Sequence, residues 1–476
     1  MPEPVMSERL AKIRELLDAH EQGHLLSGWD QLDESSRADL LDQLQLLPWD
    51  TIDVVRESIV HRVDSNPPPQ DLQPPVVCDP TPEEAAAMAE RGIAAIKAGR
   101  VAAFTVAGGQ GTRLGWNGPK GTYPATPVSG KPLFAIFAEQ ILAAQRRYGV
   151  TIPWYIMTSP VNDAATRAFF LDNKCFGLQR SNIMMFPQGT MPSFDANTGM
   201  LMLSDPGRVA ENPDGHGGAL TAMARSGALA DMQARGITII SAFQVDNPLV
   251  QVIDECFIGL HESPDHSSGE VSSKMVAKVD PTEPVGVFCQ VDGRTRVVEY
   301  SDLSEELAVA SEVDGALRFA AANIAIHLYS VEFVASLTDP GADELPWHRA
   351  RKKSSWWDPA TGSIIDPAEP NVVKLERFIF DVLPRARRSA ILQTHRACEF
   401  APIKNASGQD SAASSQQIQS DLYGGWLKKQ GVDLPWDEAG HVAASIEIGP
   451  LTAMRSEDLA GVELPGHVDQ GGSLLL

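Results

Sequence analysis

The chain has 476 residues, and its 39 Lys and Arg against 62 Asp and Glu give a formal net charge of −23 at pH 7. This acidic excess argues against nucleic-acid binding and against attraction to anionic membranes, because both surfaces repel it. With 43% hydrophobic and 21% charged residues, the composition is typical of a soluble globular protein. A polyanion that binds this chain must therefore meet a local cluster of cations and backbone N–H groups.

The cellular location predicted from the sequence is the cytoplasm. The five cysteines are scattered without a Cys-x-x-Cys pair, which favours reduced thiols over a zinc site or a disulfide framework. The first residues lack the basic-then-apolar pattern of a signal peptide. The longest apolar run, near residues 237–245, is far shorter than the roughly 20 residues that span a bilayer.

The first 80 residues are predicted to form a helical segment followed by a connector. Leu and Ile recur at helical spacing in residues 10–17 and 36–47, and Asp33 or Ser35 can cap the second run. Seven prolines then fall in the sixteen residues 67–82. Proline at this density disfavours both helix and sheet, so an extended connector is expected.

Strands and helices alternate in the next part of the chain. After a helix at 82–98, the predicted strands are 101–107, 153–158, 183–186 and 237–245, and the predicted helices are 132–148, 163–173 and 218–235. Such alternation predicts an α/β fold with a Rossmann-like mixed, mainly parallel sheet and helices on both faces.

Further along, a hairpin is predicted from strands 285–291 and 296–300 with an Asp292-Gly293 turn. A strand at 323–329 and a helix at 373–383 continue the body, and a small β-rich segment is expected after residue 431. The predicted domains are therefore 1–80, a catalytic nucleotidyltransferase domain at 81–430, and 431–476.

The most informative segment is the glycine-rich run at residues 107–121, which follows the first strand of the predicted sheet. Gly108, Gly109 and Gly111 let backbone N–H groups approach phosphate oxygens, and Arg113 and Lys120 add positive charge. In doubly wound sheets this is where ligands bind. The run does not fit a P-loop, and it lacks the third glycine of the Rossmann fingerprint.

This run resembles the nucleotide-sugar pyrophosphorylases, and nine further segments resemble the eukaryotic-type UDP-N-acetylhexosamine pyrophosphorylases, which belong to the UDP-sugar pyrophosphorylase superfamily. In chain order the segments are 153–159, 176–178, 186–189, 213–215, 245–247, 281–286, 298–301, 323–325 and 402–406. The resemblance covers roughly residues 20–450. It implies uridylyl transfer from UTP to N-acetylglucosamine 1-phosphate, giving UDP-N-acetylglucosamine and pyrophosphate.

The resemblance also implies roles for individual residues. Arg113 and Lys120 are expected at the β- and γ-phosphates of UTP, and Asp246 is expected to hold Mg²⁺, the one cofactor implied. The remaining UTP contacts are expected from Gly108, Gly109, Gly111, Gln188, Gly215 and Lys374. The sugar phosphate is expected at His216, Gly286, Glu299, Tyr300, Asn323 and Lys404.

One residue departs from the family pattern and keeps the sugar open. His216 stands where the hexosamine enzymes typically carry Asn and where UDP-glucose pyrophosphorylases carry His. The alternative function is therefore a glucose 1-phosphate, or broad UDP-sugar, uridylyltransferase. A glycosyltransferase would not need the triphosphate-binding loop, and retention of Arg113, Lys120, Asp246 and Lys404 argues against a catalytically silent nucleotide-sugar sensor.

Overall fold

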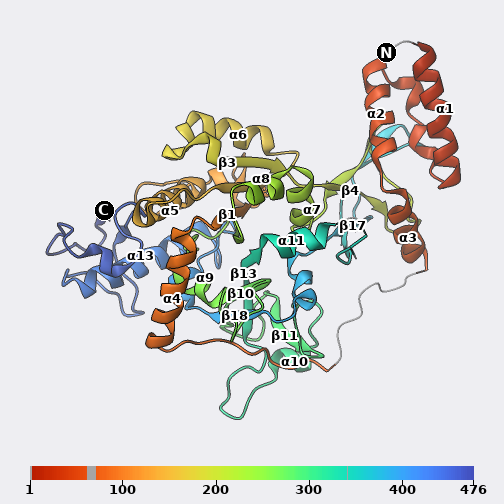
Figure 1. The fold of residues 1–476 in the computed structure, drawn as a ribbon. Coiled ribbons are helices and arrows are strands. Elements are labelled where there is room, and N and C mark those ends of the chain that lie inside the picture. Colours follow the sequence, from red (N-terminus) through yellow and green to blue (C-terminus); the bar gives the residue numbers. More distant parts are fainter. Residues whose placement is uncertain (1–2, 62–70, 340, 343) are drawn as a thin grey trace. The chain divides into compact units, whose positions relative to one another are not determined.

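The structure, a computed structural model, describes residues 3–61, 71–339, 341–342 and 344–476 (Figure 1). The chain divides into two compact units that interleave in sequence. Unit 1 comprises Met1–Pro67, Gly189–Gly218 and Leu345–Ile379, and unit 2 comprises Pro68–Gln188, Ala219–Glu344 and Phe380–Leu476. Residues 67–70 of the expected extended connector lie outside the described residues. The three predicted domains stay a prediction.

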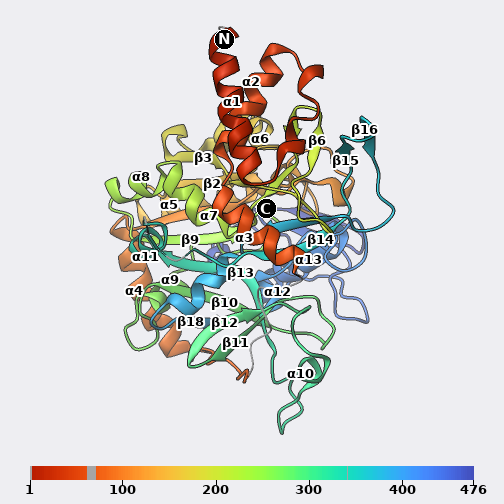
Figure 2. The ribbon, with the colours of Figure 1, turned by 90° about the vertical axis from the view of Figure 1, so that its right-hand side faces the viewer.

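The helical half of unit 1 follows the predicted pattern. Helices α1 (Glu3–Ala19), α2 (Glu34–Leu46) and α3 (Trp49–Val60) include both predicted helices. Helix α2 begins after Asp33, whose carboxylate accepts the Ser36 N–H at 2.7 Å as the predicted cap. Leucines at helical spacing, among them Leu17 and Leu40, are fully buried between these helices, and α1 and α2 lie side by side in Figure 2.

The rest of unit 1 is built from short antiparallel strands. One sheet has the order β14 (His348–Lys352), β17 (Val372–Glu376) and β5 (Phe194–Asp195). A second sheet has the order β16 (Ser363–Ile365), β15 (Trp356–Asp358), β6 (Leu203–Asp205) and β7 (Arg208–Val209). Strands β4 (Thr190–Pro192) and β8 (Glu211–Pro213) form a third pair.

The prediction of a helix at 373–383 is wrong. Residues 372–376 form strand β17, and a 3-10 turn follows at Ile379–Arg385. The β-branched Val372 and Val373 are buried and pair with β5, nearly 180 residues earlier in the chain. Pro384 cannot donate the backbone hydrogen bond that a continuing helix needs.

The central sheet of unit 2 confirms the predicted fold class. Its main order is β12-β11-β13-β9-β1-β2-β3, with β10 beside β13 and β18 beside β10. The predicted parallel strands are β1 (Val101–Val106), β2 (Trp154–Thr158), β3 (Ile183–Pro187) and β9 (Ile239–Gln244). Strands β10 (Val271–Ala277) and β18 (Ala390–Gln393) run the same way, and β13 (Ala321–Ser330) is antiparallel. The carboxyl ends of the parallel strands therefore meet at one edge, where β13 begins.

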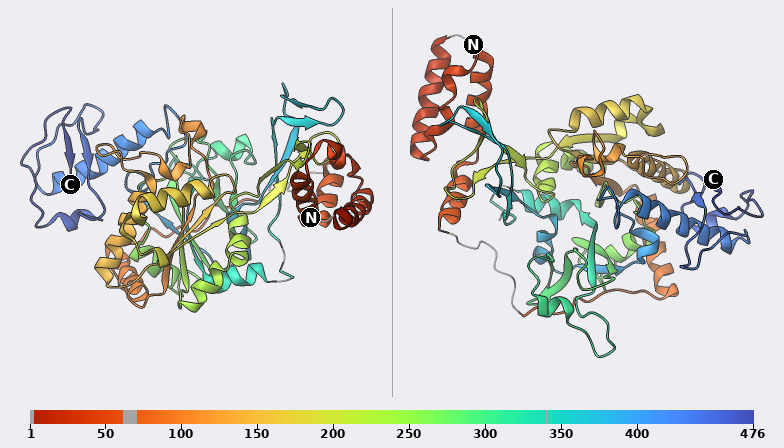
Figure 3. Two further views of the ribbon diagram at one scale, coloured as in Figure 1. Left: turned by 90° about the horizontal axis from the view of Figure 1, so that it is seen from above. Right: turned by 180° about the vertical axis from the view of Figure 1, so that it is seen from behind.

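Helices cover both faces of this sheet, as Figure 3 shows from two sides. On one face α4 (Pro82–Lys97), α5 (Leu133–Tyr148), α6 (Asp163–Asp172) and α9 (Glu255–His261) share a buried apolar core with the strands. On the other face α8 (Ala228–Ala234) holds Tyr155 of β2 through a 2.6 Å hydrogen bond to Asp231. Helix α11 (Val331–Thr338) packs against α8.

Two local predictions within unit 2 have different outcomes. The hairpin is confirmed: β11 (Val287–Val291) and β12 (Arg294–Val298) are joined by Asp292 and Gly293, both with positive φ as a type I′ turn requires. The prediction of a single helix at 218–235 is wrong. This stretch forms two helices, α7 (Gly218–Arg225) and α8, because Gly227 adopts a left-handed conformation with φ of 83°.

The last part of unit 2 is less regular than the rest. Short helices α10 (Glu305–Val309) and α12 (Arg396–Glu399) precede the long helix α13 (Ala412–Lys429), which the sequence did not predict. Beyond it, β19 (Ser445–Glu447) and β20 (Ser473–Leu475) form a parallel pair. Among the described helices, none combines the length and apolar character needed to cross a membrane.

Candidate active site

The glycine-rich loop leaves β1 at the carboxyl edge of the sheet and folds back on itself. Gly111 donates to the Gly118 carbonyl at 2.9 Å, and Lys120 donates to the Gly109 carbonyl at 3.0 Å. These two N–H groups are therefore used inside the loop and do not face a ligand. Within the described residues, no protein acceptor takes the N–H groups of Gly108 and Gly109, so these two can point at phosphate oxygens.

Two side chains from neighbouring strand ends fix the start of this loop. Asn162 is fully buried, and its amide donates to the Ala107 carbonyl at 2.9 Å and the Gly109 carbonyl at 3.3 Å. Gln188, which follows β3, lies directly over Gly108: a Cβ at that position would be 2.5 Å from the Gln188 Oε1 atom. The structure thus brings the predicted residue Gln188 to the loop and adds Asn162, which the sequence did not single out.

Asp246 lies two residues beyond β9 at the same sheet edge, as predicted. The residue is 8% exposed, and its Oδ2 atom is 3.8 Å from the Lys120 Nζ atom. The carboxylate at the end of β9 therefore lies next to an ammonium group from the glycine-rich loop. Arg113, on a 3-10 turn of the same loop, is exposed.

Residues 396–410 bring further charged groups beside Asp246. Lys404 lies 3.9 Å from the Asp410 carboxylate, and the Ile403 N–H donates to the Asp246 carbonyl at 2.8 Å. Burial raises the pKa of Asp410 above its ordinary value, and Asp246 adds to this rise while Lys404 opposes it. The predicted residues Lys404 and Asp246 are thus neighbours, with Asp410 as a second carboxylate.

An ion pair ties this segment to the segment at 277–286. Arg396 donates to the Glu283 carboxylate at 2.6 Å, and Glu283 also accepts the Val279 N–H at 2.9 Å. Glu283 is 7% exposed, whereas the Arg396 side chain is 25% exposed, so only the carboxylate is removed from water. Because the two partners are 113 residues apart, no local sequence pattern reveals the pair.

The predicted sugar residues of unit 2 gather where β13 begins. Asn323 donates its backbone N–H to the Gly286 carbonyl at 2.8 Å, and a Cβ at position 286 would be 3.1 Å from the Glu299 Oε1 atom. The Asn323 side-chain oxygen accepts the Ala325 N–H at 3.0 Å. Ala325 has φ of 57° at a register shift between β13 and β10, a bulge that re-aims the start of the strand. Tyr300 is 55% exposed.

Gly215, His216 and Lys374 belong to unit 1. Gly215 lies against the backbone of Arg377, whose carbonyl oxygen would be 2.4 Å from any Cβ at that position. The His216 Nδ1 atom accepts the Ile379 N–H at 3.1 Å, and the ring stacks on Phe378. Burial lowers the pKa of Lys374 below its ordinary value, while Glu376 opposes the shift.

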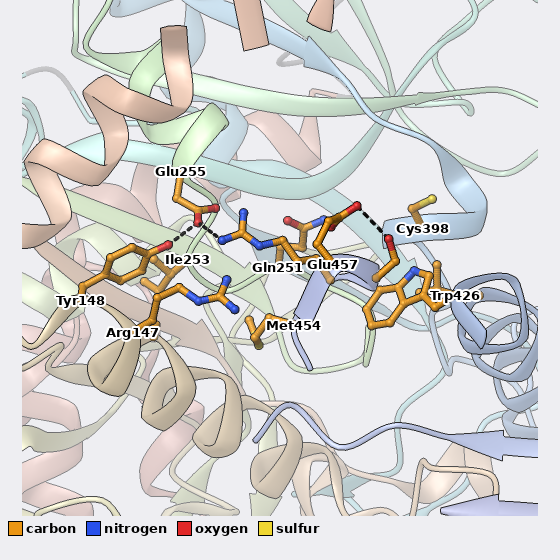
Figure 4. Close-up of a pocket in the computed structure, with 13 residues that line it drawn as sticks. Arg147, Tyr148, Gln251, Ile253, Glu255, Cys398, Trp426, Met454 and Glu457 are labelled. Atoms are coloured by element: carbon orange, nitrogen blue, oxygen red, sulfur yellow. Dashed lines mark hydrogen bonds and ion pairs between the residues drawn. The ribbon is translucent and has the colours of Figure 1, made fainter. Parts of the chain in front are cut away.

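A separate cavity of about 240 Å³ lies within unit 2 between α5, α13 and the segment near residue 455 (Figure 4). Tyr148 donates to the Glu255 carboxylate there, and Arg455 lies 3.5 Å from the same carboxylate. Burial, together with this carboxylate, raises the pKa of Tyr148. The cavity contains none of the predicted site residues.

The donor set around Asp246 fits a magnesium ion that is shared with a substrate. No group of three or more His, Cys, Asp or Glu side chains within the described part of the chain could hold a metal without help. Mg²⁺ is commonly bound by one or two carboxylates together with substrate phosphates. A nearly buried carboxylate beside the glycine-rich loop meets that requirement.

The fold and site define a nucleotide-binding α/β protein, and comparison with known proteins gives its family. The sequence model described as UTP--glucose-1-phosphate uridylyltransferase matches residues 79–424, and the chain belongs to this family. The resemblance found in the sequence is thereby confirmed.

Individual relatives are similar over most of their length. The UDP-N-acetylhexosamine pyrophosphorylase-like protein 1 of Xenopus tropicalis is 36% identical over 438 residues, covering 88% of this chain and 84% of the relative. The UDP-N-acetylglucosamine pyrophosphorylase of Saccharomyces cerevisiae is 38% identical over 347 residues, covering 71% and 72%. The solved uridine diphosphate N-acetylglucosamine pyrophosphorylase of Trypanosoma brucei is 27% identical, covers 95% and 94%, and superposes with a TM-score of 0.78.

Proposed function

We propose that this chain is a uridylyltransferase that converts UTP and N-acetylglucosamine 1-phosphate to UDP-N-acetylglucosamine and pyrophosphate. The observation that carries the proposal lies at the carboxyl edge of the sheet. There the Nζ atom of Lys120, in the glycine-rich loop, is 3.8 Å from the Oδ2 atom of Asp246. This pairing supplies both signs of charge that a metal–triphosphate complex needs. The relatives named for N-acetylhexosamine or N-acetylglucosamine support the choice of sugar.

The reaction needs positioning and charge neutralisation rather than an enzyme nucleophile. A phosphate oxygen of the sugar 1-phosphate attacks the α-phosphorus of UTP in line, and the bond to the β-phosphate oxygen breaks as pyrophosphate departs. The N–H groups of Gly108 and Gly109, with Arg113 and Lys120, would bind the β- and γ-phosphates and receive the charge that develops on the leaving group. Lys404 would bind the phosphate of the attacking sugar.

Asp246 would hold Mg²⁺, which when bound neutralises charge on the phosphates. Gln188 would contact the uracil through its amide, and Glu299 and Asn323 would bind sugar hydroxyl or acetamido groups through hydrogen bonds. The roles of Gly111, Gly215 and Lys374 toward UTP, and of His216, Gly286 and Tyr300 toward the sugar, stay predictions. Each of the five cysteines lies within the described residues and is a free thiol, which supports a cytoplasmic location.

Glucose 1-phosphate is the second candidate acceptor. His216, at a position where the hexosamine enzymes typically carry Asn, favours it, and so does the description of the family. The segments 281–286 and 298–300 resemble the enzymes for acetylated sugars and favour N-acetylglucosamine 1-phosphate.

The test is pyrophosphate release from UTP and Mg²⁺ on adding sugar 1-phosphates one at a time. We expect N-acetylglucosamine 1-phosphate to give the highest kcat/KM and glucose 1-phosphate a lower one. A higher kcat/KM with glucose 1-phosphate would establish the second candidate. No pyrophosphate with any sugar 1-phosphate would refute the proposal.

A further inference from the structure

Asn247, the residue after Asp246, has no role in the proposed chemistry but occupies a central position. It is 5% exposed, and both polar atoms of its amide make hydrogen bonds to backbone groups. The Nδ2 atom donates to the Glu399 carbonyl at 2.7 Å, and the Oδ1 atom accepts the Ala401 N–H at 3.0 Å. One side chain thus reaches across to a segment more than 150 residues away and satisfies both a donor and an acceptor there.

These contacts continue a short ladder between the two segments. The Asp246 carbonyl accepts the Ile403 N–H at 2.8 Å, so residues 246–247 and 399–403 are joined at three points. The ladder ends next to Lys404. Asp246, proposed to hold the metal, and Lys404, proposed to bind the sugar phosphate, therefore lie at the same end of this ladder, and Asn247 makes the contacts at the other end.

The far side of the ladder is anchored by buried charge. The Glu399 carboxylate accepts the Thr394 hydroxyl at 2.9 Å and the Gln251 N–H at 3.2 Å, and it pairs with Lys274. Both charged side chains are 1% exposed. A buried charge network of this kind resists displacement, because moving one member leaves another charge without a partner. The segment that Asn247 grips is therefore a fixed support.

We propose that Asn247 is a positioning residue that sets the spacing between Asp246 and Lys404. The inference rests on the function proposed above. Without the amide, residues 246–247 and 399–403 keep only the hydrogen bond from the Ile403 N–H to the Asp246 carbonyl. The Asp246 carboxylate can then move relative to the Lys404 ammonium. Metal binding and transition-state stabilisation depend on such spacing more steeply than substrate affinity does.

The test compares Asn247→Ser with the parent chain in two measurements. Binding of Mn²⁺ in the presence of UTP is followed by the electron paramagnetic resonance signal of free Mn²⁺, and kcat and KM are measured separately. We expect Mn²⁺ affinity to fall about tenfold and kcat by roughly 10- to 100-fold. The KM for UTP is expected to change by less than about threefold.

Asn371→Ser is the matched control. The Asn371 amide also makes two backbone hydrogen bonds, both of 3.0 Å to Ser354, and it lies in unit 1. We expect this variant to lose thermal stability without losing Mn²⁺ affinity or kcat. If Asn247→Ser behaves in the same way as this control, Asn247 is a structural residue only and the inference is overturned.

A milder variant decides the question if Asn247→Ser does not fold. Thr394→Val removes one hydrogen bond to Glu399 with little change in shape, and we expect a fall in Mn²⁺ affinity of about threefold or more. Affinity equal to that of the parent would overturn the inference. A parent chain that binds Mn²⁺ and UTP but releases no pyrophosphate would refute the proposed function alone, because the Mn²⁺ comparison still tests Asn247.

Discussion

Asp246 combines burial with a position 3.8 Å from an ammonium group, and the whole metal proposal depends on it. We expect Asp246→Ala to lower kcat by a hundredfold or more, because loss of the metal ligand removes roughly several kcal/mol of transition-state stabilisation. Turnover at saturating Mg²⁺ measures the effect. Asp314→Ala, at an exposed position in the same unit, is the control. Activity of Asp246→Ala within about tenfold of the parent would rule out the metal assignment.

Arg113 and Lys120 are expected to act on the departing pyrophosphate. Arg113→Ala and Lys120→Ala should each lower kcat by roughly 100-fold, while the KM for the sugar 1-phosphate changes little. Steady-state kinetics with varied sugar 1-phosphate separates the two effects. Lys97→Ala, at the exposed end of α4, should leave both constants unchanged. A rise in KM with kcat intact would place the two side chains at the sugar phosphate instead.

His216 has a structural contact that its predicted role did not include. Its Nδ1 atom accepts the Ile379 N–H, an interaction that the Oδ1 atom of Asn can also make. We therefore expect His216→Asn to keep the loop intact and to raise the preference for N-acetylglucosamine 1-phosphate over glucose 1-phosphate by roughly 5- to 150-fold. The ratio of the two kcat/KM values is the measurement. An unchanged ratio would leave His216 with the shaping of the loop alone.

Individual site residues were predictable where they belong to a contiguous motif. The loop carrying Gly108, Arg113 and Lys120 and the strand end before Asp246 have local signatures. Asn162, by contrast, acts through a contact with Gly109 that exists only after β1 and β2 pair. Contacts between distant segments leave no mark in the local sequence.

Elements were predictable where local chemistry decides them. Thr81 caps helix α4 with both hydrogen bonds of a capping box, and the Asp292-Gly293 turn closes its hairpin. Strand β17 was misread as a helix because its partners, β14 and β5, come from other parts of the chain. Tertiary pairing, rather than the periodicity of 373–383, determines its conformation.

Helix α9 ends at a histidine whose burial makes stability depend on pH. His261 is 1% exposed, and burial lowers its pKa to about 4 from an ordinary value of 6.5, while Glu262 opposes the shift. Above pH 6.5 the His261 side chain is neutral in both the folded and the unfolded state, so its full contribution to the free energy of unfolding is present. As the pH falls toward 4, only the unfolded state takes up the proton, so stability is lost. With about 1.4 kcal/mol per pKa unit, the loss is about 3 kcal/mol.

Urea unfolding at several pH values checks this expectation. The free energy of unfolding of His261→Leu should depend less steeply on pH between 6.5 and 4 than that of the parent. His266→Gln, at an exposed position five residues later, should keep the slope of the parent. Parallel curves for the parent and His261→Leu would show that His261 does not couple folding to pH.

The organisation of the whole molecule was the least predictable feature. Unit 1 is assembled from three separate stretches, so the N-terminal helices share a hydrophobic core with residues near 200 and near 370. A reading along the chain divides it into consecutive parts and cannot detect such interleaving. The mainly parallel sheet of unit 2 was predictable because its βα units are consecutive in sequence and their strands are strongly apolar.

One of the contacts between the C-terminal segment of unit 2 and the body of that unit is made by a buried carboxylate. Glu447 is 2% exposed and accepts the N–H groups of Val128 and Ser129 at 3.0 and 2.7 Å and the Ser129 hydroxyl at 2.6 Å. Hydrogen bonds to a charged group contribute about 1.5–3 kcal/mol each. We expect Glu447→Ala to lower the free energy of unfolding by about 3 kcal/mol, and Glu447→Gln by less, because its oxygen can still accept.

Hydrogen exchange locates this effect as well as measuring it. In Glu447→Ala the amides of Val128 and Ser129 should exchange faster. They lose their acceptor, and the C-terminal segment no longer shields them from water. Glu438→Ala, at an exposed position of the same segment, should leave both amides protected. Because the segment at 126–131 follows shortly after the glycine-rich loop, the result also tests whether the C-terminal segment supports that loop. Unchanged protection in Glu447→Ala would show that the loop holds its conformation without the C-terminal segment.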